Sequence, residues 1–405
     1  MRRYQRQYGD VFRLHIDPDH PWVMVADPDA VTAIFRAGPD EVHAGEANHI
    51  LRPTLGEHSV LCLDDDAHLR QRRLLLPPFH GERMQAYRDV MREATERELE
   101  RMPRGEPFAL REHTQAITLE VIMRAVFGVT EQGELDRLRA VLGTTVAWFG
   151  NAGNLVRQVL LGPEHPRVAA GRRRLLDPLD RELHRLIAER RAAPDLQERE
   201  DVLSMLLLAR DEDGEGMSDA ELRDELLTLL FAGHETTATG LAWAFERMGR
   251  RPEVLARLTA EARTEATTYT DAVVKETLRL RPVVQIVVRR LLRDFELGGW
   301  LVPAGETVAV SIYLMHRRPD LYPQPDAFAP ERFLDAAPSS TYAWIPFGGG
   351  IRRCIGAAFA QVEMQVVLRT LVANGTFETV GASERPTRRA VTLVPARGGQ
   401  VVLHA

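Results

Sequence analysis

Hydrophobic and polar residues follow two different periods along the chain. Runs such as DVFRLHI and PWVMVAD near the start, broken by Pro and Asp, predict short strands. From about residue 65 to residue 281, apolar residues recur three and four positions apart, which predicts helices. After Pro282 the strand-like runs FEL, WLV and TVAVSIYLM return, separated by turns. The pattern therefore predicts a mainly α-helical protein with a smaller β-rich lobe.

Two helices stand out in this pattern. Ser218 and Glu221 form a capping box, and the helical pattern that follows extends from about residue 219 to residue 250. A helix of this length is roughly 48 Å long and would cross the whole molecule. The last strong helix begins just after Cys354 and extends to about Ala373, with Gly375 at the expected stop.

The length and the charge limit the class of protein. With 405 residues, of which 44% are hydrophobic, the chain can bury a large core, and we expect a single domain over residues 1–405. Its β-rich lobe would comprise approximately residues 10–60, 283–315 and 388–404, and its helical lobe residues 65–281 and 355–373. The 52 basic residues against 58 acidic ones argue against a nucleic-acid partner.

The beginning of the chain carries no recognisable targeting signal. MRRYQRQYGD lacks the apolar core of a signal peptide, and no apolar run approaches the ~18 residues of a membrane span. We therefore expect a cytoplasmic protein. Two cysteines are too few for a disulfide framework. Cys62, in the apolar run SVLCL, is interpreted as a small buried hydrophobic residue.

Cys354 lies in FGGGIRRCIGAAFA, between a glycine-rich loop and the start of a helix. A helix N-terminus, with Arg352 and Arg353 nearby, should lower the pKa of this thiol and favour the thiolate that binds metals. The glycines at 348, 349, 350 and 356 would let a flat macrocycle lie on the backbone. A structural thiol, a catalytic nucleophile or a phosphate loop are alternatives, but no GK[ST] and no nucleophile motif surround the cysteine.

This loop resembles the FxxGxxxCxG motif of the cytochromes P450, with Phe347, Gly350, Cys354 and Gly356 at the four positions. The resemblance covers nearly the whole chain, from YGDVF to TLVPARGGQVVL. It implies the cytochrome P450 fold of a bacterial-type soluble haem-thiolate monooxygenase. Haem b, iron protoporphyrin IX, would lie between the long central helix and the cysteine loop.

The resemblance also implies which residues hold the haem. Cys354 would be the axial ligand of the iron, and Phe347 would pack near its sulfur. Arginines and a histidine would bind the two propionates, which are carboxylates that need charge-assisted donors: Arg352, the HxxxR pair His68 and Arg72, and Arg289. Contacts to the macrocycle are expected from Ala232, Gly233, Pro346, Gly348 and Gly356.

Two further patterns gain meaning from the resemblance. Glu276 and Arg279 lie three residues apart on one helix face. Such a pair alone is a weak signal, because surface ion pairs of this spacing are common and contribute little. In the family this pair bonds to a third residue, here Arg332 of APERF, and the three form a structural lock.

In AGHETT, Gly233 and two threonines weaken the long helix in mid-span. The segment could be a polar patch that tolerates a kink, but the resemblance implies that Thr236 hydrogen-bonds dioxygen and that Glu235 relays protons.

The implied reaction is insertion of one atom of dioxygen into a C–H or C=C bond of a lipophilic small molecule. Since no GxGxxG fingerprint is present, electrons would come from a ferredoxin or flavodoxin with its NAD(P)H-dependent reductase. A peroxide-driven haem hydroxylase and a non-catalytic haem-binding or gas-sensing protein are the alternatives. We expect a monomer. Family analogy places the substrate pocket along 43–61 and 148–161, with Leu229, Val283, Val284 and Ile286.

Overall fold

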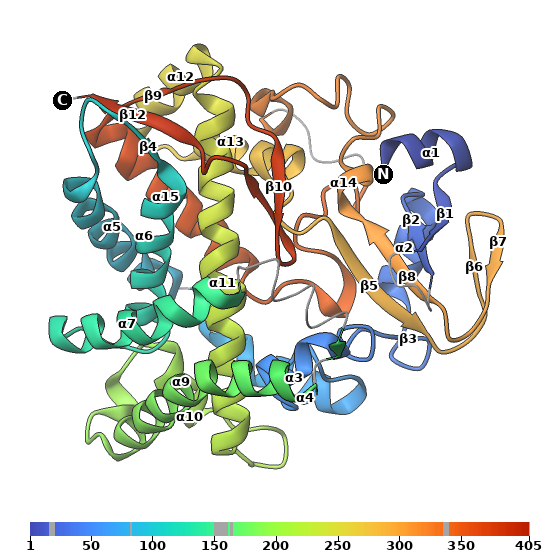
Figure 1. Cartoon of the computed structure of the whole chain (residues 1–405), viewed down its shortest axis with the longest axis horizontal. Helices are drawn as coiled ribbons and strands as arrows, with labels where there is room; N and C mark the ends of the chain where they lie inside the picture. Colours follow the sequence, from blue (N-terminus) through green and yellow to red (C-terminus); the bar gives the residue numbers. More distant parts are fainter. Residues whose placement is uncertain (16–20, 82, 150–160, 163–164, 335–339, 405) are drawn as a thin grey trace.

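One long helix, α11 (Asp219–Met248), runs through the middle of the helical lobe (Figure 1). The predicted capping box is confirmed: the Ser218 hydroxyl accepts the Glu221 N–H at 3.2 Å, and the Glu221 carboxylate accepts the Ser218 N–H at 2.7 Å. The helix ends at Met248, two residues earlier than predicted. The computed structural model describes residues 1–15, 21–81, 83–149, 161–162, 165–334 and 340–404.

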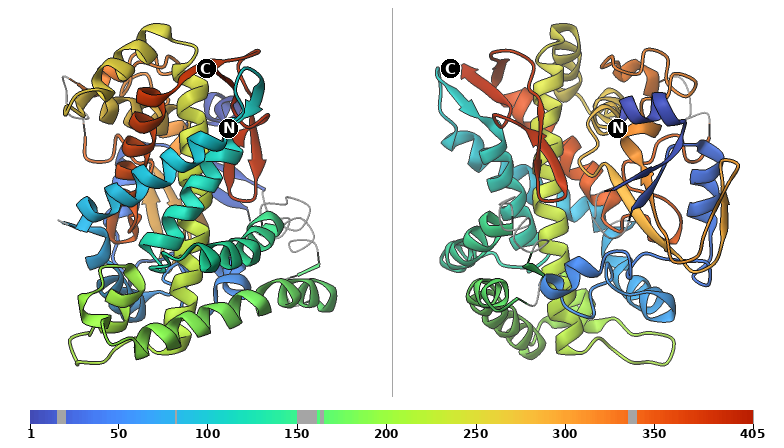
Figure 2. Two further views of the ribbon diagram at one scale, coloured as in Figure 1. Left: turned by 90° about the vertical axis from the view of Figure 1, so that its left-hand side faces the viewer. Right: turned by 45° about the vertical axis from the view of Figure 1, so that its right-hand side comes forward.

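The other helices of this lobe lie around α11, as the two views of Figure 2 show. They are α3 (Arg52–Leu55), α4 (Asp65–Leu75), α5 (Arg83–Arg101), α6 (Leu110–Ala125), α7 (Gln132–Phe149), α9 (Pro166–Ala192), α10 (Val202–Leu208), α12 (Pro252–Ala262), α13 (Thr268–Leu280) and α15 (Ala357–Asn374). α6 and α15 contact α11 directly. The apolar side chains of these helices form one continuous core, which holds α11 rigidly in place.

The β-rich lobe is built on a five-stranded sheet in the order β1-β2-β8-β5-β3. Its strands are β1 (Val11–Leu14), β2 (Trp22–Val25), β3 (Val42–His43), β5 (Ile286–Leu291) and β8 (Thr307–Ser311). β2 and β8 are parallel, with Trp22 opposite Thr307, and the other pairs are antiparallel. Alternate residues of β2 and β8 pack against α2 (Pro28–Arg36), which follows α1 (Arg2–Tyr8) and the first two strands.

Three smaller sheets complete the chain. They are β4 (Pro107–Ala109), β12 (Gln400–His404) and β9 (Thr376–Thr379); the hairpin β6 (Phe295–Leu297) and β7 (Trp300–Val302); and the hairpin β10 (Pro386–Arg389) and β11 (Thr392–Pro395). The predicted fold class is confirmed, with two local corrections. β4 interrupts the region predicted to be helical, and TVAVSIYLM is a strand only to Ser311, where that hydroxyl caps the short helix α14 (Ile312–Met315).

Two further expectations bear on the fold. Cys62 is buried, as predicted, and burial raises the pKa of its thiol to about 11. Within the described residues, every helix is too short or too polar to span a lipid bilayer.

Candidate functional site

Cys354 lies in the turn that leads into α15, three residues before the first residue of that helix. Its backbone N–H donates to the Phe347 carbonyl at 3.0 Å, and the N–H of Gly356 donates to its sulfur. The ring of Phe347 packs edge-on against Trp344, with centroids 5.9 Å apart. The backbone therefore fixes the position of a cysteine side chain that is exposed to solvent.

The pKa of Cys354 corrects our prediction. Although its side chain is exposed, enough protein surrounds the sulfur for burial to raise the pKa of the thiol, and this outweighs the lowering by the Gly356 amide and the charges of Arg72 and Arg353. We expected Arg352 to contribute, but it turns to Asp64 instead. A metal cation at the sulfur would supply the positive charge that stabilises the thiolate.

The glycines of the loop serve two purposes. A Cβ atom at Gly349 would come within 2.3 Å of the Phe35 ring, and one at Gly350 within 2.0 Å of the Phe35 carbonyl oxygen. Packing against α2 therefore explains these two glycines, which we had assigned to a macrocycle. At Gly348 the nearest atom would be 3.9 Å away, and at Gly356 nothing lies within 4 Å. Space for a flat ligand is thus present beside Gly348 and Gly356.

Four basic side chains gather near this loop from three parts of the chain. His68 and Arg72 lie one turn apart on α4, Arg289 lies on β5, and Arg352 lies just before the cysteine. His68, Arg289 and Arg352 line one cleft. Arg289 donates to its neighbour's carbonyl, at Val288, whereas the Arg72 guanidinium donates no hydrogen bond within the described residues. The sequence-predicted propionate ligands are therefore brought together.

These basic groups lack matching anions. Burial, followed by the charges of Arg352, Arg72 and Arg289, lowers the pKa of His68 to about 3. Burial, with Arg352 next in importance, lowers the pKa of Arg289 to about 10. Asp64 is the only carboxylate among the described residues that pairs with this cluster, and it contacts Arg352. Buried cations need anionic partners, so a ligand with two carboxylates and one flat face, such as haem b, fits these residues.

Arg352 is also tied to the segment that precedes α4. Its Nη1 donates to the Val60 carbonyl at 3.3 Å, and its Asp64 partner accepts the backbone N–H groups of residues 44, 45 and 46 at 2.8–2.9 Å. The N–H of Val60 donates at 2.8 Å to the buried Glu225 on α11. Burial raises the pKa of Glu225 well above its usual value.

The middle of α11 passes through AGHETT without a break. Ala232 is exposed although it lies in mid-helix, and the Thr236 hydroxyl donates to the Ala232 carbonyl at 2.6 Å. A Cβ atom at Gly233 would come within 3.1 Å of Ile122 on α6, so close helix packing accounts for that glycine. Ala232 and Thr236 therefore border an open space, and Gly233 faces α6.

Glu235 points toward α6. Arg111 and Gln115, both on α6, donate to its two carboxylate oxygens, Gln115 at 2.8 Å. Arg389, the last residue of β10, places its Nε 3.8 Å from Glu235 Oε1. The predicted proton-relay residue is thus held by groups that the sequence pattern did not indicate.

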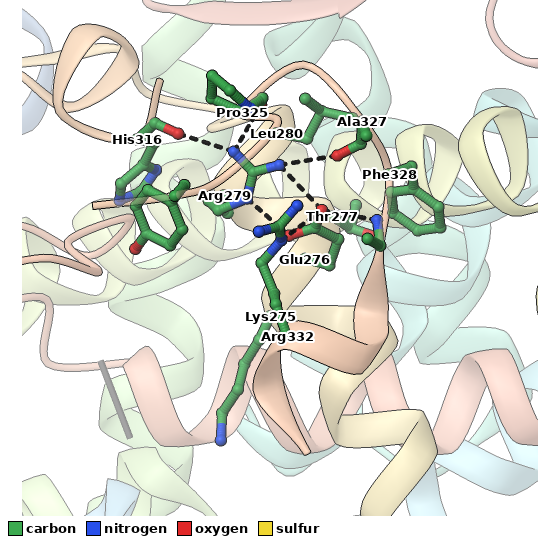
Figure 3. Close-up of polar contacts among 12 residues, drawn as sticks. Lys275, Glu276, Thr277, Arg279, Leu280, His316, Pro325, Ala327, Phe328 and Arg332 are labelled. Atoms are coloured by element: carbon green, nitrogen blue, oxygen red, sulfur yellow. Dashed lines mark hydrogen bonds and ion pairs between the residues drawn. The ribbon is translucent and has the colours of Figure 1, made fainter. Parts of the chain in front are cut away.

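The Glu276–Arg279 pair is the centre of a buried network (Figure 3). Both side chains are fully buried, and the Arg279 Nε donates to Glu276 Oε2 at 2.6 Å. Arg332 donates to Glu276 Oε1 at 3.2 Å, so the structure brings together all three predicted members. Arg279 also donates to the carbonyls of His316, Pro325 and Ala327 at 2.7, 2.8 and 3.0 Å.

The predicted substrate-pocket residues lie on α11, on the segment between α13 and β5, and at the start of β5. Leu229 is half-buried on α11. Val283 is buried and its carbonyl accepts the Leu393 N–H at 3.0 Å, while Val284 pairs with Thr392. Ile286 begins β5. Residues 150–160 of the predicted pocket lie outside the described residues.

Sequence reasoning missed several buried polar groups. Glu363 on α15 is completely enclosed; burial raises its pKa to about 8 and the Thr237 hydroxyl, which bonds to it, lowers that value. His316 is also buried, and its Nε2 accepts the Ile345 N–H at 2.8 Å. Neither contact follows a fixed spacing, so the only sequence signal was a polar residue in an apolar run.

Comparison with known proteins agrees with this site. A protein-family model described as cytochrome P450 matches residues 1–402. Cytochrome P450 135B1 of Mycobacterium tuberculosis is 42% identical over 410 residues, which cover 99% of this chain and 86% of that protein. Cytochrome P450 138 of the same organism is 41% identical over 406 residues, covering 99% of this chain and 90% of that protein.

A solved structure has the same fold. The cyanobacterial protein CYP120A1, in a structure with retinoic acid bound, superposes with a TM-score of 0.87 at 25% sequence identity. The match covers 100% of this chain and 93% of that one.

Proposed function

Because the chain belongs to the cytochrome P450 family and is a haem monooxygenase, we propose that it transfers one atom of dioxygen to a C–H or C=C bond of a lipophilic small molecule. The second oxygen atom leaves as water. Electrons come from a separate ferredoxin or flavodoxin with its NAD(P)H-dependent reductase. The proposal is supported above all by the exposed Cys354 sulfur, which receives the Gly356 N–H beside a cluster of unmatched cations.

The residues of this cluster would hold the haem. Cys354 would supply the thiolate that holds the iron, and Gly348 and Gly356 would leave room for the ring beside Pro346 and Phe347. The propionates would be bound by His68, Arg72, Arg289 and Arg352, of which only Arg352 has a carboxylate partner within the described residues. When bound, the haem supplies the redox-active iron at which dioxygen is reduced.

On the opposite side, α11 supplies the polar groups that handle dioxygen and protons. The Thr236 hydroxyl donates to the Ala232 carbonyl at 2.6 Å, and by rotating away it can donate to dioxygen instead. Glu235, the adjacent residue, is anchored by Arg111 and Gln115, and its carboxylate passes protons to the open space when it leaves those partners. Positioning and proton supply are thus the tasks of this chain's own side chains.

The substrate is expected to be largely apolar. Leu229, Val283, Val284 and Ile286 present hydrocarbon surface, which favours lipophilic molecules. The likeness to CYP120A1, a protein solved with retinoic acid, supports a lipophilic substrate that carries an acid group.

The assignment of Cys354 has a direct spectroscopic test. The reduced protein under carbon monoxide should show the red-shifted Soret band of thiolate ligation, and Cys354→Ala should abolish it. Cys62→Ala is the matched control, because Cys62 is buried away from solvent, and it should retain the band. A native protein without this band, or a Cys354→Ala variant that keeps it, would disprove the proposal.

Measurements of substrate turnover distinguish the proposed function from two alternatives. A peroxide-driven hydroxylase would be faster with hydrogen peroxide than with a reduced ferredoxin and dioxygen. A haem carrier or gas sensor would be reduced efficiently yet oxidise no substrate. We expect coupled turnover with the reduced ferredoxin, because the Glu235–Thr236 pair is present and fixed on α11.

A further inference from the structure

Two arginines share one carboxylate beside the middle of α11. Arg111 donates to Glu235 Oε1, and the side chains of this pair retain only 8% and 17% of their exposure. Gln115 donates to the other oxygen, Oε2, at 2.8 Å. Arg389 approaches from a different element, but its Nε stays 3.8 Å from Oε1, which is too far for a hydrogen bond. Both carboxylate oxygens therefore already accept a hydrogen bond, and Arg389 is a second cation that has no hydrogen-bond acceptor within the described residues.

One donor of each guanidinium group, the Nε–H, has no hydrogen-bond acceptor in the described part of the chain. The Nε atoms of Arg111 and Arg389 are buried and have no hydrogen-bond partner, and within the described residues nothing accepts from the Arg389 guanidinium. Burial and then the charge of Arg111 lower the pKa of Arg389, which still remains a cation. His234, which is buried nearby, is kept neutral because burial and the same two arginines lower its pKa to about 4. Arg389 thus has only a 3.8 Å ion pair with Glu235, a carboxylate whose two oxygens already accept hydrogen bonds from Arg111 and Gln115.

Arg389 lies on a hairpin that is bonded to two of the predicted pocket residues, Val283 and Val284. Arg389 is the last residue of β10, and the β10–β11 hairpin runs beside α11 to its middle (Figure 1). On its other edge the hairpin is bonded to Val283 and Val284 through Leu393 and Thr392. A ligand that contacts Arg389 would therefore lie between α11 and the segment that leads into β5.

We propose that Arg389, supported by Arg111, binds the carboxylate of a lipophilic acid, so that the substrate is an amphipathic acid rather than a neutral hydrocarbon. This inference rests on the proposed monooxygenase function and names its substrate class. A guanidinium presents two parallel N–H donors that match the two oxygens of a carboxylate. A substrate carboxylate would supply the hydrogen-bond acceptor that Arg389 lacks, while the apolar tail follows Val283 and Val284.

Ligand titration of the haem-loaded protein tests this site. The probes are matched pairs with one tail and different heads: tetradecanoic acid against tetradecan-1-ol, and retinoic acid against retinol. Dissociation constants are read from the spin-state shift of ferric haem, with equilibrium dialysis as a second readout. Because a charge-assisted hydrogen bond contributes about 1.5–3 kcal/mol, we expect the acid of at least one pair to bind about tenfold or more tightly than its alcohol.

Three variants at two adjacent residues make the test specific. Arg389→Gln should weaken binding of the acid about tenfold and leave binding of the alcohol unchanged, whereas Arg389→Lys should retain part of the preference because it keeps the charge. Arg388→Gln is the matched control: Arg388 is exposed on the same strand and should keep the native preference. All variants should show the thiolate band under carbon monoxide.

Three results would overturn the inference. They are equal binding of acid and alcohol in both pairs, no binding of either acid, and an acid preference that survives Arg389→Gln. Each can be observed with the thiolate band intact, in which case the haem-thiolate assignment stands. Loss of the band in the native protein would instead refute the proposed function itself.

Discussion

The Nε2 atom of His316 accepts a hydrogen bond at 2.8 Å from the backbone N–H of Ile345, two residues before Phe347. The carbonyl of the same histidine accepts a hydrogen bond at 2.7 Å from Arg279 (Figure 3). His316 therefore connects the Glu276–Arg279 network to the loop that carries Cys354. Since Nε2 is an acceptor, the imidazole must be neutral for this connection to exist.

Replacing His316 should make the free energy of unfolding depend less on pH under acidic conditions. Burial, with the charges of Arg279 and Arg317, lowers the pKa of His316 to about 3 from an ordinary value of 6.5. Between these values the unfolded chain binds a proton that the folded protein excludes. The free energy of unfolding therefore falls as the pH falls from about 6.5, by up to about 1.4 kcal/mol per pH unit.

Urea unfolding between pH 6 and pH 4 measures this effect. The Gln side chain can still accept the Ile345 N–H but does not titrate. The free energy of unfolding of His316→Gln should therefore change less with pH than that of the native protein, by up to about 1.4 kcal/mol per pH unit. His404→Gln, at an exposed position, is the control and should keep the native slope. Equal slopes for the native protein and His316→Gln would contradict the assignment.

The buried arginine of the lock should not tolerate lysine. Arg279→Lys keeps the positive charge but cannot reach Glu276 and the carbonyls of His316, Pro325 and Ala327 at the same time. We expect a loss of about 3–5 kcal/mol of stability, as for other broken buried pairs, and little haem per chain after purification. Arg263→Lys, at an exposed position, should be neutral. Full haem content in Arg279→Lys would argue against the lock.

Arg289 and its neighbour Arg290 should differ in haem retention. Arg289 is 6% exposed and has no carboxylate partner in the part of the chain that the structure describes, whereas Arg290 lies 3.5 Å from Glu46. Losing a charge-assisted bond to a propionate should speed transfer of haem from Arg289→Gln to apomyoglobin about tenfold. The Arg289→Gln apoprotein should be at least as stable as the native apoprotein, because a repulsion with Arg352 is removed. Faster haem loss from Arg290→Gln than from Arg289→Gln would refute this role.

Thr236→Ala should separate haem binding from coupled turnover. Among the described residues the hydroxyl bonds only to the Ala232 and Gly233 carbonyls, so its removal should leave the thiolate band and the fold unchanged. Without a donor for dioxygen, electrons should be diverted to hydrogen peroxide. The measurement is peroxide formed per NADPH consumed, with Thr236→Ser as the control that restores the hydroxyl. An unchanged ratio in Thr236→Ala would remove Thr236 from the mechanism.

Local sequence rules predicted the features that local chemistry determines. The capping box of Ser218 and Glu221 placed the start of α11 correctly, because both partners lie within one turn. The glycine-flanked cysteine indicated a ligand loop for the same reason. Ile312–Met315 was predicted as a strand, because an apolar run gives no sign of the Ser311 cap that starts a helix there.

Long-range contacts explain what could not be predicted. β4 has three residues and forms only because it pairs with β12, about three hundred residues later. The pKa of Cys354 depends on how much protein surrounds the sulfur, and the motif gave only the nearby charges, so the predicted direction was wrong. The partners of Glu235 come from α6 and β10, and no spacing in the sequence relates these residues.

The backbone N–H of Val60 donates to Glu225 on α11, and its carbonyl accepts from Arg352, one of the proposed propionate ligands. The segment expected to form one wall of the pocket is thus bonded both to the central helix and to a residue that would contact the prosthetic group. A change at either contact should therefore be transmitted to the shape of the pocket, and we expect haem binding and selectivity for substrate shape to be coupled through Val60.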